Sequence, residues 1–335
     1  MRQVLILGGT AWLGREIARA ALERGAEVTC LARGSAGETA PGARLVRADR
    51  AAPGAYDALL DREWDEVVEI SYDLGFVQSG LDALAARAGH WTLVSSVSVY
   101  ADDDVPHSDE TARLVEPLDL DNYAHAKVAV ERATQAVVGD RLLIGRPGLI
   151  VGPGDGSGRF GYWPGRFAAA AADGGPVLMP NVEDRWSQVI DVRDLAEWIV
   201  DAGAARVTGI VNAVGDEYPL DEVLELAAEA SGFAGERVVA SDEALVAADV
   251  RYWSGPRSLP LWLPAEATGF MRYKNDAYRG SGGMLRPLAE TIADVRDDEA
   301  ALGLDRPQRS GLTRAEELEV LATLGGDGSG TSSGR

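Results

Sequence analysis

The sequence predicts an α/β protein with a doubly wound parallel sheet and a smaller, discontinuous C-terminal lobe. Short apolar runs alternate with segments of helical periodicity through the first half of the chain. A glycine-rich turn joins the first strand to the first helix, and the chain changes to glycine and aromatic residues after residue 151. With 335 residues, 46% of them apolar, the chain is long enough to bury a large core.

The first β-α-β unit is visible at the N-terminus. Residues 4–7 form a short apolar run, apolar residues recur at helical spacing over 13–21, and 28–32 forms a second buried strand. Gly25 occupies the place of a left-handed helix C-cap. The unit spans about thirty residues, which is the length that a crossover between parallel strands needs.

The same alternation continues to residue 151 and predicts about six strands. The further strands and helices are expected at 45–46, 67–70, 77–88 (helix), 91–95, 123–138 (helix) and 141–151.

A glycine and aromatic loop is expected over 157–167, after which 189–192, a helix from 195 and 210–214 again resemble elements of the sheet. We therefore expect a dinucleotide-binding Rossmann domain over 1–151 plus 187–216, and a substrate lobe over 152–186 plus 217–324. A last helix begins with a capping box at 313–316, and the Gly/Ser-rich tail 325–335 is expected to be disordered.

Charge and composition exclude several classes of protein. Asp and Glu outnumber Lys and Arg by 53 to 32, and a net charge of -21 would repel nucleic acid. The single cysteine, Cys30, and three scattered histidines predict neither a disulfide nor a metal site. No apolar stretch is long enough for a signal peptide or a membrane span, so a cytoplasmic protein is expected, as a monomer or homodimer.

The turn after the first strand predicts a site for NADP or NAD. A dinucleotide pyrophosphate approaches the backbone N–H groups at a helix N-terminus, which requires glycines at close positions. The middle glycine of the usual pattern is Ala11 here, which adds one methyl group. The residues expected to contact the cofactor in this turn are Gly8, Thr10, Ala11, Trp12, Leu13 and Gly14.

Residues after the next strands favour NADP, with NAD possible. No carboxylate follows the second strand, and Arg33 suits a 2′-phosphate, although a solvated surface arginine is the alternative. Asp49 and Arg50 follow the third strand and should border the adenine, and Ser71 follows the fourth.

A proton-transfer group is indicated by Tyr123 and Lys127, one helical turn apart. A neighbouring cation lowers the pKa of a phenol from its unperturbed value near 10. Ser96 follows a predicted strand, and ligands of parallel sheets lie at the carboxyl ends of strands.

In this order and spacing, these motifs resemble the extended short-chain dehydrogenase/reductase family, in its NAD-dependent epimerase/dehydratase branch, over residues 1–215. The turn also resembles an atypical reductase-like branch. The resemblance implies that Tyr123 is the general acid/base, that Lys127 lowers its pKa and holds the nicotinamide ribose, and that Ser96 hydrogen-bonds the reacting oxygen. It also implies cofactor contacts for Pro147 and Gly148.

One departure from the family bears on the substrate. Ser187 and Asp191 stand where nucleotide-sugar members have an arginine and a histidine, so a non-nucleotide-sugar substrate is expected. Core packing is the alternative for the aromatic residues of the lobe, and a solvated or structural role is the alternative for Arg159. The candidate substrate residues are Ser98, Arg159, Tyr162, Trp163 and Gln188.

The leading hypothesis is an NAD(P)-dependent oxidoreductase that transfers a hydride between nicotinamide and a carbonyl or hydroxyl of a small molecule. One alternative is an epimerase or dehydratase with transient hydride transfer on a sugar-like substrate. Another is a non-catalytic relative that senses NAD(P) or binds RNA. The negative charge argues against RNA, and the Ser-Tyr-Lys set argues for chemistry.

Overall fold

The computed structural model describes residues 1–327, which form two compact units. The sheet unit comprises Met1–Ile150, Gln188–Asp216 and Gly269–Leu285. The lobe unit comprises Val151–Ser187, Glu217–Thr268 and the chain from Arg286. The chain crosses between the units within β7 (Leu149–Val151) and β9 (Trp186–Asp191).

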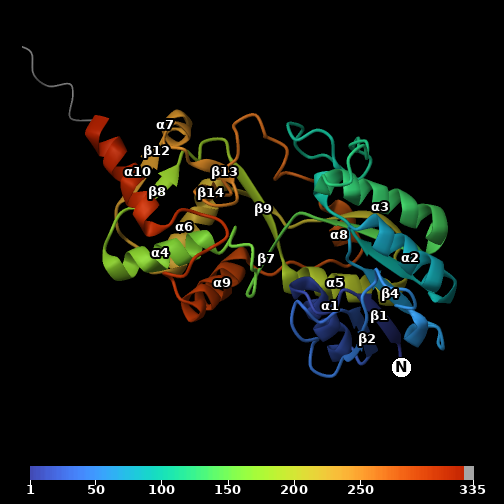
Figure 1. Ribbon diagram of the computed structural model, residues 1–335. Helices are drawn as coiled ribbons and strands as arrows, with labels where there is room; N and C mark the ends of the chain where they lie inside the picture. The colour runs from blue at the N-terminus through green and yellow to red at the C-terminus, as the bar shows by residue number, and fades with distance from the viewer. Residues whose placement is uncertain (328–335) are drawn as a thin grey trace, which may run out of the picture. The chain divides into compact units, whose positions relative to one another are not determined.

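The sheet unit contains a seven-stranded parallel sheet in the order β10-β6-β5-β4-β1-β2-β3 (Figure 1). This order confirms the predicted doubly wound α/β fold, because the strand sequence reverses direction between β1 and β4. The strands are β1 (Gln3–Leu7), β2 (Glu27–Ala32), β3 (Arg44–Arg47), β4 (Glu66–Glu69), β5 (Trp91–Val94), β6 (Leu142–Pro147) and β10 (Gly209–Ala213).

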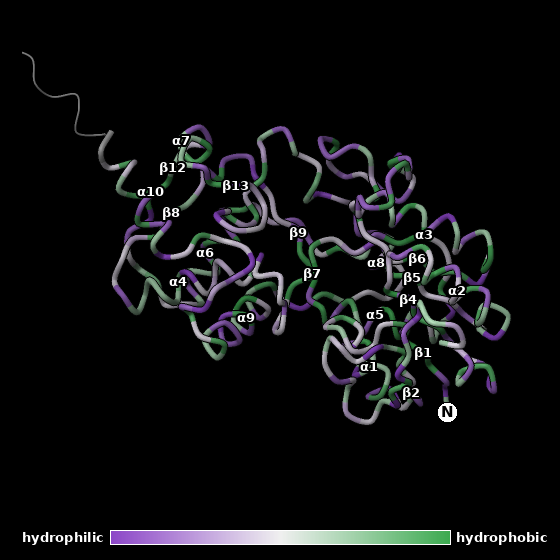
Figure 2. The backbone as a smooth tube through the Cα atoms, in the orientation of Figure 1, coloured by the Kyte–Doolittle hydropathy of each residue, from purple (hydrophilic) through white to green (hydrophobic). Residues whose placement is uncertain are grey.

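Helices cover both faces of this sheet, so its central strands are buried on both sides (Figures 1 and 2). Ile6 packs with residues of α1 and α5 on one face, and Leu7 packs with residues of α2 and α3 on the other. The helices of the sheet unit are α1 (Trp12–Glu23), α2 (Leu74–Leu84), α3 (Tyr123–Val138), α5 (Val192–Ala205) and α8 (Asp276–Gly280), with short 3₁₀ turns η1 (Asp57–Leu59), η2 (Ala85–Arg87), η3 (Val97–Val99) and η4 (Gly139–Arg141).

The segment 269–285 belongs to the sheet unit, whereas the sequence placed it in the lobe. Tyr278 is fully buried in the core beneath α5, and its ring lies 5.3 Å from that of Trp198. The side-chain amide of Gln188 donates to the carbonyl of Tyr273 (2.7 Å) and accepts from its N–H (2.9 Å). These contacts join residues about 80 positions apart, which local sequence patterns do not reveal.

The lobe unit combines helices with two small parallel strand pairs, β8 with β12 and β13 with β14. Helices α4, α6 and α9 pack against one another. The elements are α4 (Tyr162–Asp173), β8 (Val177–Pro180), β11 (Glu217–Pro219), α6 (Leu220–Ala230), β12 (Arg237–Ala240), α7 (Asp242–Ala247), β13 (Arg251–Trp253), β14 (Ser258–Pro260), α9 (Leu288–Leu302) and α10 (Arg314–Asp327).

Two expectations for the lobe need correction and one is confirmed. The glycine and aromatic segment is a loop only until Tyr162, where α4 begins, because the alanine run that follows favours a helix. The capping box is present: Thr313 N–H donates to the Glu316 carboxylate (2.8 Å), and Glu316 N–H donates to the Thr313 hydroxyl (3.3 Å). Helix α10 includes residues 325–327 of the expected tail, and 328–335 lie outside the described residues.

Within residues 1–327, none of the helices combines the length and the apolar character needed to cross a bilayer.

Candidate active site

The glycines of the first turn are required by the backbone. Gly8 has φ +115°, a conformation that residues with a side chain rarely adopt. A Cβ on Gly14 would lie 2.9 Å from the Cα of Gly9 and would collide with the carbonyl oxygen of Gly8. Ala11 is the N-cap residue of α1 with φ -79°, so a side chain there causes no strain. The departure from glycine at this position is therefore compatible with the turn.

A cavity of about 260 Å³ opens beside this turn, at the carboxyl ends of β1, β2, β3 and β4. It is bordered by the start of α1, and an anion there would meet backbone N–H groups and the positive end of a helix. These features fit a dinucleotide cofactor. Its lining residues include seven of those predicted, namely Gly8, Thr10, Ala11, Arg33, Asp49, Arg50 and Ser71.

Three predicted cofactor residues of the turn, Trp12, Leu13 and Gly14, do not line the cavity. Leu13 is buried in the core between the sheet and α1, and Trp12 is half-buried against the same core. Their positions on the first turn of α1 explain this, because only one side of a helix N-terminus faces the cavity.

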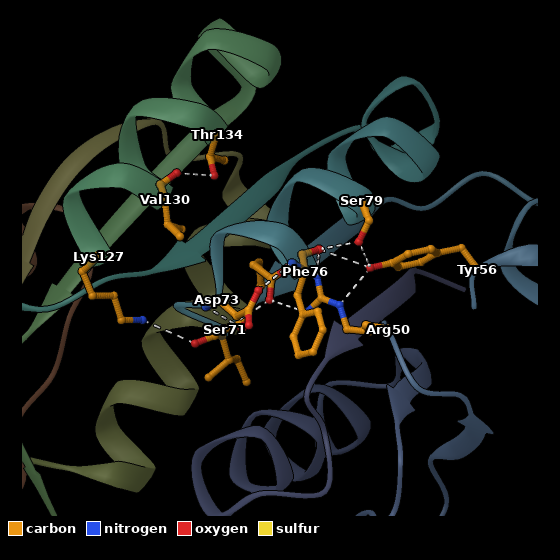
Figure 3. A network of polar contacts seen from close by, with 11 residues as sticks. Arg50, Tyr56, Ser71, Asp73, Phe76, Ser79, Lys127, Val130 and Thr134 are labelled. Carbon is orange, nitrogen blue, oxygen red and sulfur yellow. Dashed lines mark hydrogen bonds and ion pairs between the residues drawn. The ribbon is translucent and has the colours of Figure 1, made fainter. Parts of the chain in front are cut away.

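Arg50 is held by the protein itself (Figure 3). Its guanidinium pairs with Glu69 at 2.9 and 2.5 Å, donates to the Tyr56 hydroxyl at 2.8 Å and donates to the carbonyl of Phe76 at 2.6 Å. Burial disfavours its charge, but the ion pair and hydrogen bonds outweigh burial and raise the pKa of Arg50. Arg50 therefore forms part of the cavity wall, and most of its N–H groups are hydrogen-bonded to other residues of the protein. Glu69 was not predicted as a site residue, although a carboxylate within an otherwise apolar strand is a signal of such a partner.

Arg33 is exposed at the rim of the cavity, as a cofactor-binding arginine requires. The next residue, Gly34, has φ +81°, and a Cβ built on it would lie 2.6 Å from a guanidinium nitrogen of Arg47. Two arginines, one after β2 and one at the end of β3, are thus brought to the same loop. Asp49 accepts a hydrogen bond from the N–H of Ala51 (3.0 Å), which fixes the loop after β3.

Lys127 is one of two lysines in the chain, and it is buried with only 3% of its surface exposed. Its ammonium donates to the carbonyl of Val94 at 2.7 Å and to that of Ile70 at 3.4 Å. Figure 3 shows the Lys127 side chain reaching from α3 toward the end of β4. Burial lowers the pKa of Lys127 to about 8, against the opposing attraction of Glu69 and Glu131. The ammonium is therefore fixed at the carboxyl ends of β4 and β5.

Tyr123 is the first residue of α3, and Asn122 caps this helix by accepting from the N–H groups of Ala124 (2.9 Å) and His125 (3.3 Å). The cap fixes where the helix begins and hence where the phenol emerges. Tyr123 is 45% exposed, and its ring centre lies 5.8 Å from the ammonium of Lys127. The predicted pair is thus brought together, with the phenol open to a ligand and the ammonium beneath it.

Ser96 follows β5, two residues after the carbonyl that binds Lys127. Its hydroxyl accepts from the N–H of Ser98 (3.1 Å) and lies 3.1 Å from the Ser98 hydroxyl. The 3₁₀ turn η3 that follows packs against α3 through Val97, Val99 and Val128. This packing fixes Ser96 at the carboxyl edge of the sheet, near the base of α3, with Ser98 as its hydrogen-bond partner.

Pro147 ends β6 at the same edge of the sheet, where it is paired with Ala213 of β10. A Cβ on Gly148 would lie 3.1 Å from a methyl group of Val214, so a larger residue would crowd this strand end.

The structure argues against substrate roles for three predicted residues. Trp163 is 1% exposed and donates from its indole N–H to the carbonyl of Pro260 at 2.7 Å, and Tyr162 packs edge-on against it in the lobe core. Gln188 is 3% exposed and is used to hold the segment around Tyr273. These contacts favour core packing over substrate binding for Tyr162 and Trp163. Arg159 is half-buried and lies over the ring of Trp253 at 5.6 Å.

Tyr72 is a second residue that the sequence analysis missed. It follows β4, lines the cavity, and its ring meets that of Tyr123 edge-on, with centres 5.1 Å apart. No local pattern marks it, because its neighbour Tyr123 is 51 positions away.

Asp191 has a structural reason to differ from the histidine of other members. It caps α5 by accepting from the N–H of Arg193 (2.9 Å) and pairs with the guanidinium of the same residue (2.7 Å). Because Asp191 is needed as a helix cap, its identity carries little information about the substrate. The prediction of a non-nucleotide-sugar substrate rested partly on this position.

Comparison with known proteins provides the family. The NAD dependent epimerase/dehydratase family matches residues 4–215. The dTDP-6-deoxy-L-talose 4-dehydrogenase (NAD(P)(+)) of Kitasatospora kifunensis is 30% identical over 261 residues, which cover 69% of this chain and 79% of that protein. Its nucleotide-sugar substrate is at odds with the non-nucleotide-sugar expectation.

Solved structures share the fold. A putative epimerase from Burkholderia cenocepacia superposes with a TM-score of 0.71 at 23% identity, covering 90% of this chain and 98% of that one. The RMD protein from Pseudomonas aeruginosa, solved with NADPH, superposes with a TM-score of 0.61 at 18% identity, covering 90% and 99%. This chain belongs to the NAD-dependent epimerase/dehydratase family and is an enzyme of the dehydrogenase or epimerase type.

Proposed function

We propose that this enzyme is an NADP(H)-dependent dehydrogenase or reductase that interconverts a hydroxyl and a carbonyl group on a nucleotide-linked deoxysugar. The observation that carries the proposal is the buried Lys127 ammonium beneath the exposed phenol of Tyr123, at the edge of the sheet where the cavity opens. The relative from Kitasatospora kifunensis supports the choice of substrate class, because its substrate is a deoxysugar joined to a nucleotide.

The proposed cofactor site is the cavity beside the glycine turn. Gly8, Ala11 and Gly14 would let the pyrophosphate approach the N-terminus of α1, while Asp49 and Ser71 border the same space. Bound there, the nicotinamide supplies or accepts the hydride at the substrate carbon.

In the proposed mechanism, the hydroxyl of Tyr123 gives a proton to the substrate oxygen during reduction and takes it back during oxidation. The ammonium of Lys127 favours the phenolate form of Tyr123, because a cation near a phenol stabilises its negative charge. The hydroxyl of Ser96 hydrogen-bonds the same substrate oxygen and fixes its position.

Preference for NADP is part of the proposal. Strand β2 ends at Ala32 and is followed by Arg33, with no carboxylate to repel a 2′-phosphate. Arg33 is exposed at the cavity, and the guanidinium of Arg47 lies against the neighbouring Gly34. A dianionic phosphate would find two guanidinium groups at this rim.

An epimerase is the second candidate, favoured by the family match. It would use the same Tyr123 and Lys127 but return the hydride to the substrate, so the cofactor would show no net change.

Incubation with NADPH and a dTDP-4-keto-6-deoxysugar distinguishes these candidates. For the reductase, we expect the absorbance of NADPH to fall as the sugar is reduced. The Tyr123→Phe variant should still bind NADPH but should show no such fall in absorbance. An epimerised sugar without net change in cofactor would favour the second candidate. Full turnover by Tyr123→Phe would refute the assigned proton donor.

A further inference from the structure

Tyr72 is a second phenol beside Tyr123, and the proposed mechanism gives it no task. The two rings meet edge-on, with centres 5.1 Å apart and an interplanar angle of 74°. The ammonium of Lys127 lies 5.8 Å from the centre of each ring. A cation at this distance is attracted by the electron-rich face of an aromatic ring.

The carboxylates near Lys127 are already occupied by other cations. Glu69, at the end of β4, is paired with Arg50 at 2.5 Å, and Glu131, one turn along α3, is paired with Arg146 at 2.7 Å. Each pair is bidentate and buried, so each guanidinium neutralises most of the charge that the carboxylate could offer to Lys127.

Two carbonyl oxygens and two aromatic rings also contact the ammonium. The carbonyls of Val94 and Ile70 accept its hydrogen bonds, and the rings belong to Tyr72 and Tyr123. Because burial already lowers the pKa of Lys127 to about 8, a modest further loss of stabilisation would leave part of the side chain uncharged near neutral pH.

We propose that Tyr72 is a positioning residue for proton transfer: its ring holds the phenol of Tyr123 over Lys127 and helps to keep the Lys127 ammonium charged. This inference rests on the proposed function of Tyr123. It assigns the task to the aromatic ring of Tyr72, and the hydroxyl is not required. The titration of Lys127 in Tyr72→Phe should therefore match that of the wild type, whereas the titration in Tyr72→Leu, which fills similar space without a ring, should not.

The chain offers a direct measurement of the charge. Lys127 and Lys274 are the two lysines in the sequence, so protein grown on lysine labelled with ¹³C at the ε carbon gives two resonances. Lys274→Arg, a change at a half-exposed position, assigns them. The pH titration of the Lys127 resonance is followed in the full-length wild type, Tyr72→Phe and Tyr72→Leu.

We expect the titration midpoint of Lys127 to fall by about half a pH unit in Tyr72→Leu and to stay within error in Tyr72→Phe. In the oxidation assay, the acid limb of kcat should move to higher pH by a similar amount in Tyr72→Leu, because a less charged Lys127 favours the phenolate of Tyr123 less.

An unchanged Lys127 midpoint in Tyr72→Leu would overturn the inference, as would an equal shift in Tyr72→Phe. The titration needs no substrate, so it separates the two proposals. A shifted midpoint in a protein that turns over no carbonyl or hydroxyl substrate would support the electrostatic role and refute the proposed reaction.

Discussion

Replacing Lys127 with methionine should abolish turnover and, at neutral pH, stabilise the fold. Met is unbranched, nearly as long as lysine and apolar, so it can fill the same buried space. The ammonium of Lys127 is fully enclosed between β4, β5 and α3, where a charge lacks the solvation it has in the unfolded chain.

The magnitude follows from the pKa of Lys127, which burial lowers from 10.5 to about 8 against the attraction of Glu69 and Glu131. This difference corresponds to about 3 kcal/mol of destabilisation while the lysine is charged in both states. Losing the hydrogen bonds to Val94 and Ile70 should cost about 1–2 kcal/mol. Lys127→Met is therefore expected to raise the free energy of unfolding by about 1–2 kcal/mol at pH 7.

Whether stability rises or falls with pH depends on whether the folded or the unfolded protein binds the proton of Lys127 more tightly. Between about pH 8 and pH 10.5 the unfolded lysine is protonated and the folded one is not, so the stability of the wild type rises with pH through this window. The advantage of Lys127→Met should therefore shrink by about 2 kcal/mol between pH 7 and pH 9.5.

Urea unfolding of both proteins at these two pH values, followed by circular dichroism, measures the difference. Loss of activity with retained secondary structure is expected alongside. If Lys127→Met were less stable than the wild type by the same amount at both pH values, the reasoning from burial of the charge would be refuted.

Three further predictions follow from the sheet unit. Gly14→Ala should weaken NADPH binding at least about tenfold, because the added methyl collides with the turn, whereas Gly156→Ala, in open space, should bind normally in a fluorescence titration. Arg33→Ala should weaken NADPH about tenfold and leave NADH unchanged by calorimetry, and equal losses for both would contradict the 2′-phosphate assignment. Glu131→Gln should lower the free energy of unfolding by about 3 kcal/mol because it leaves the guanidinium of Arg146 buried without its carboxylate; a change under about 1 kcal/mol in urea unfolding would show that this pair is dispensable.

Much of the sheet unit could be predicted because its signals are local. Residues 4–32 show strand, turn and helix periods within one β-α-β unit, and the predicted helix 123–138 coincides with α3. The glycines of the first turn could be predicted for the same reason. Gly8 is required by its own backbone conformation, and Gly14 is required by backbone atoms only a few positions away. The pairing of Tyr123 with Lys127 is likewise a property of helical spacing.

Other features depended on contacts between distant parts of the chain. Arg50 lines the cavity, but local patterns did not reveal that a carboxylate 19 positions away, Glu69, holds its guanidinium. Tyr162 and Trp163 were candidate substrate residues, and the packing of the lobe buries both. Burial of a polar or aromatic side chain depends on which elements cover it, and no local period encodes that.

The sequence by itself determined the doubly wound sheet, the cofactor turn and the Tyr-Lys pair, because each follows from the backbone periods of helix and strand. Only the tertiary structure decided that 269–285 packs on the sheet unit and that Tyr72 lies beside Tyr123. The physical reason is that folding brings together side chains separated by tens of residues. Their contacts do not change the periodicity of apolar and polar residues in either segment, so the sequence pattern does not predict them.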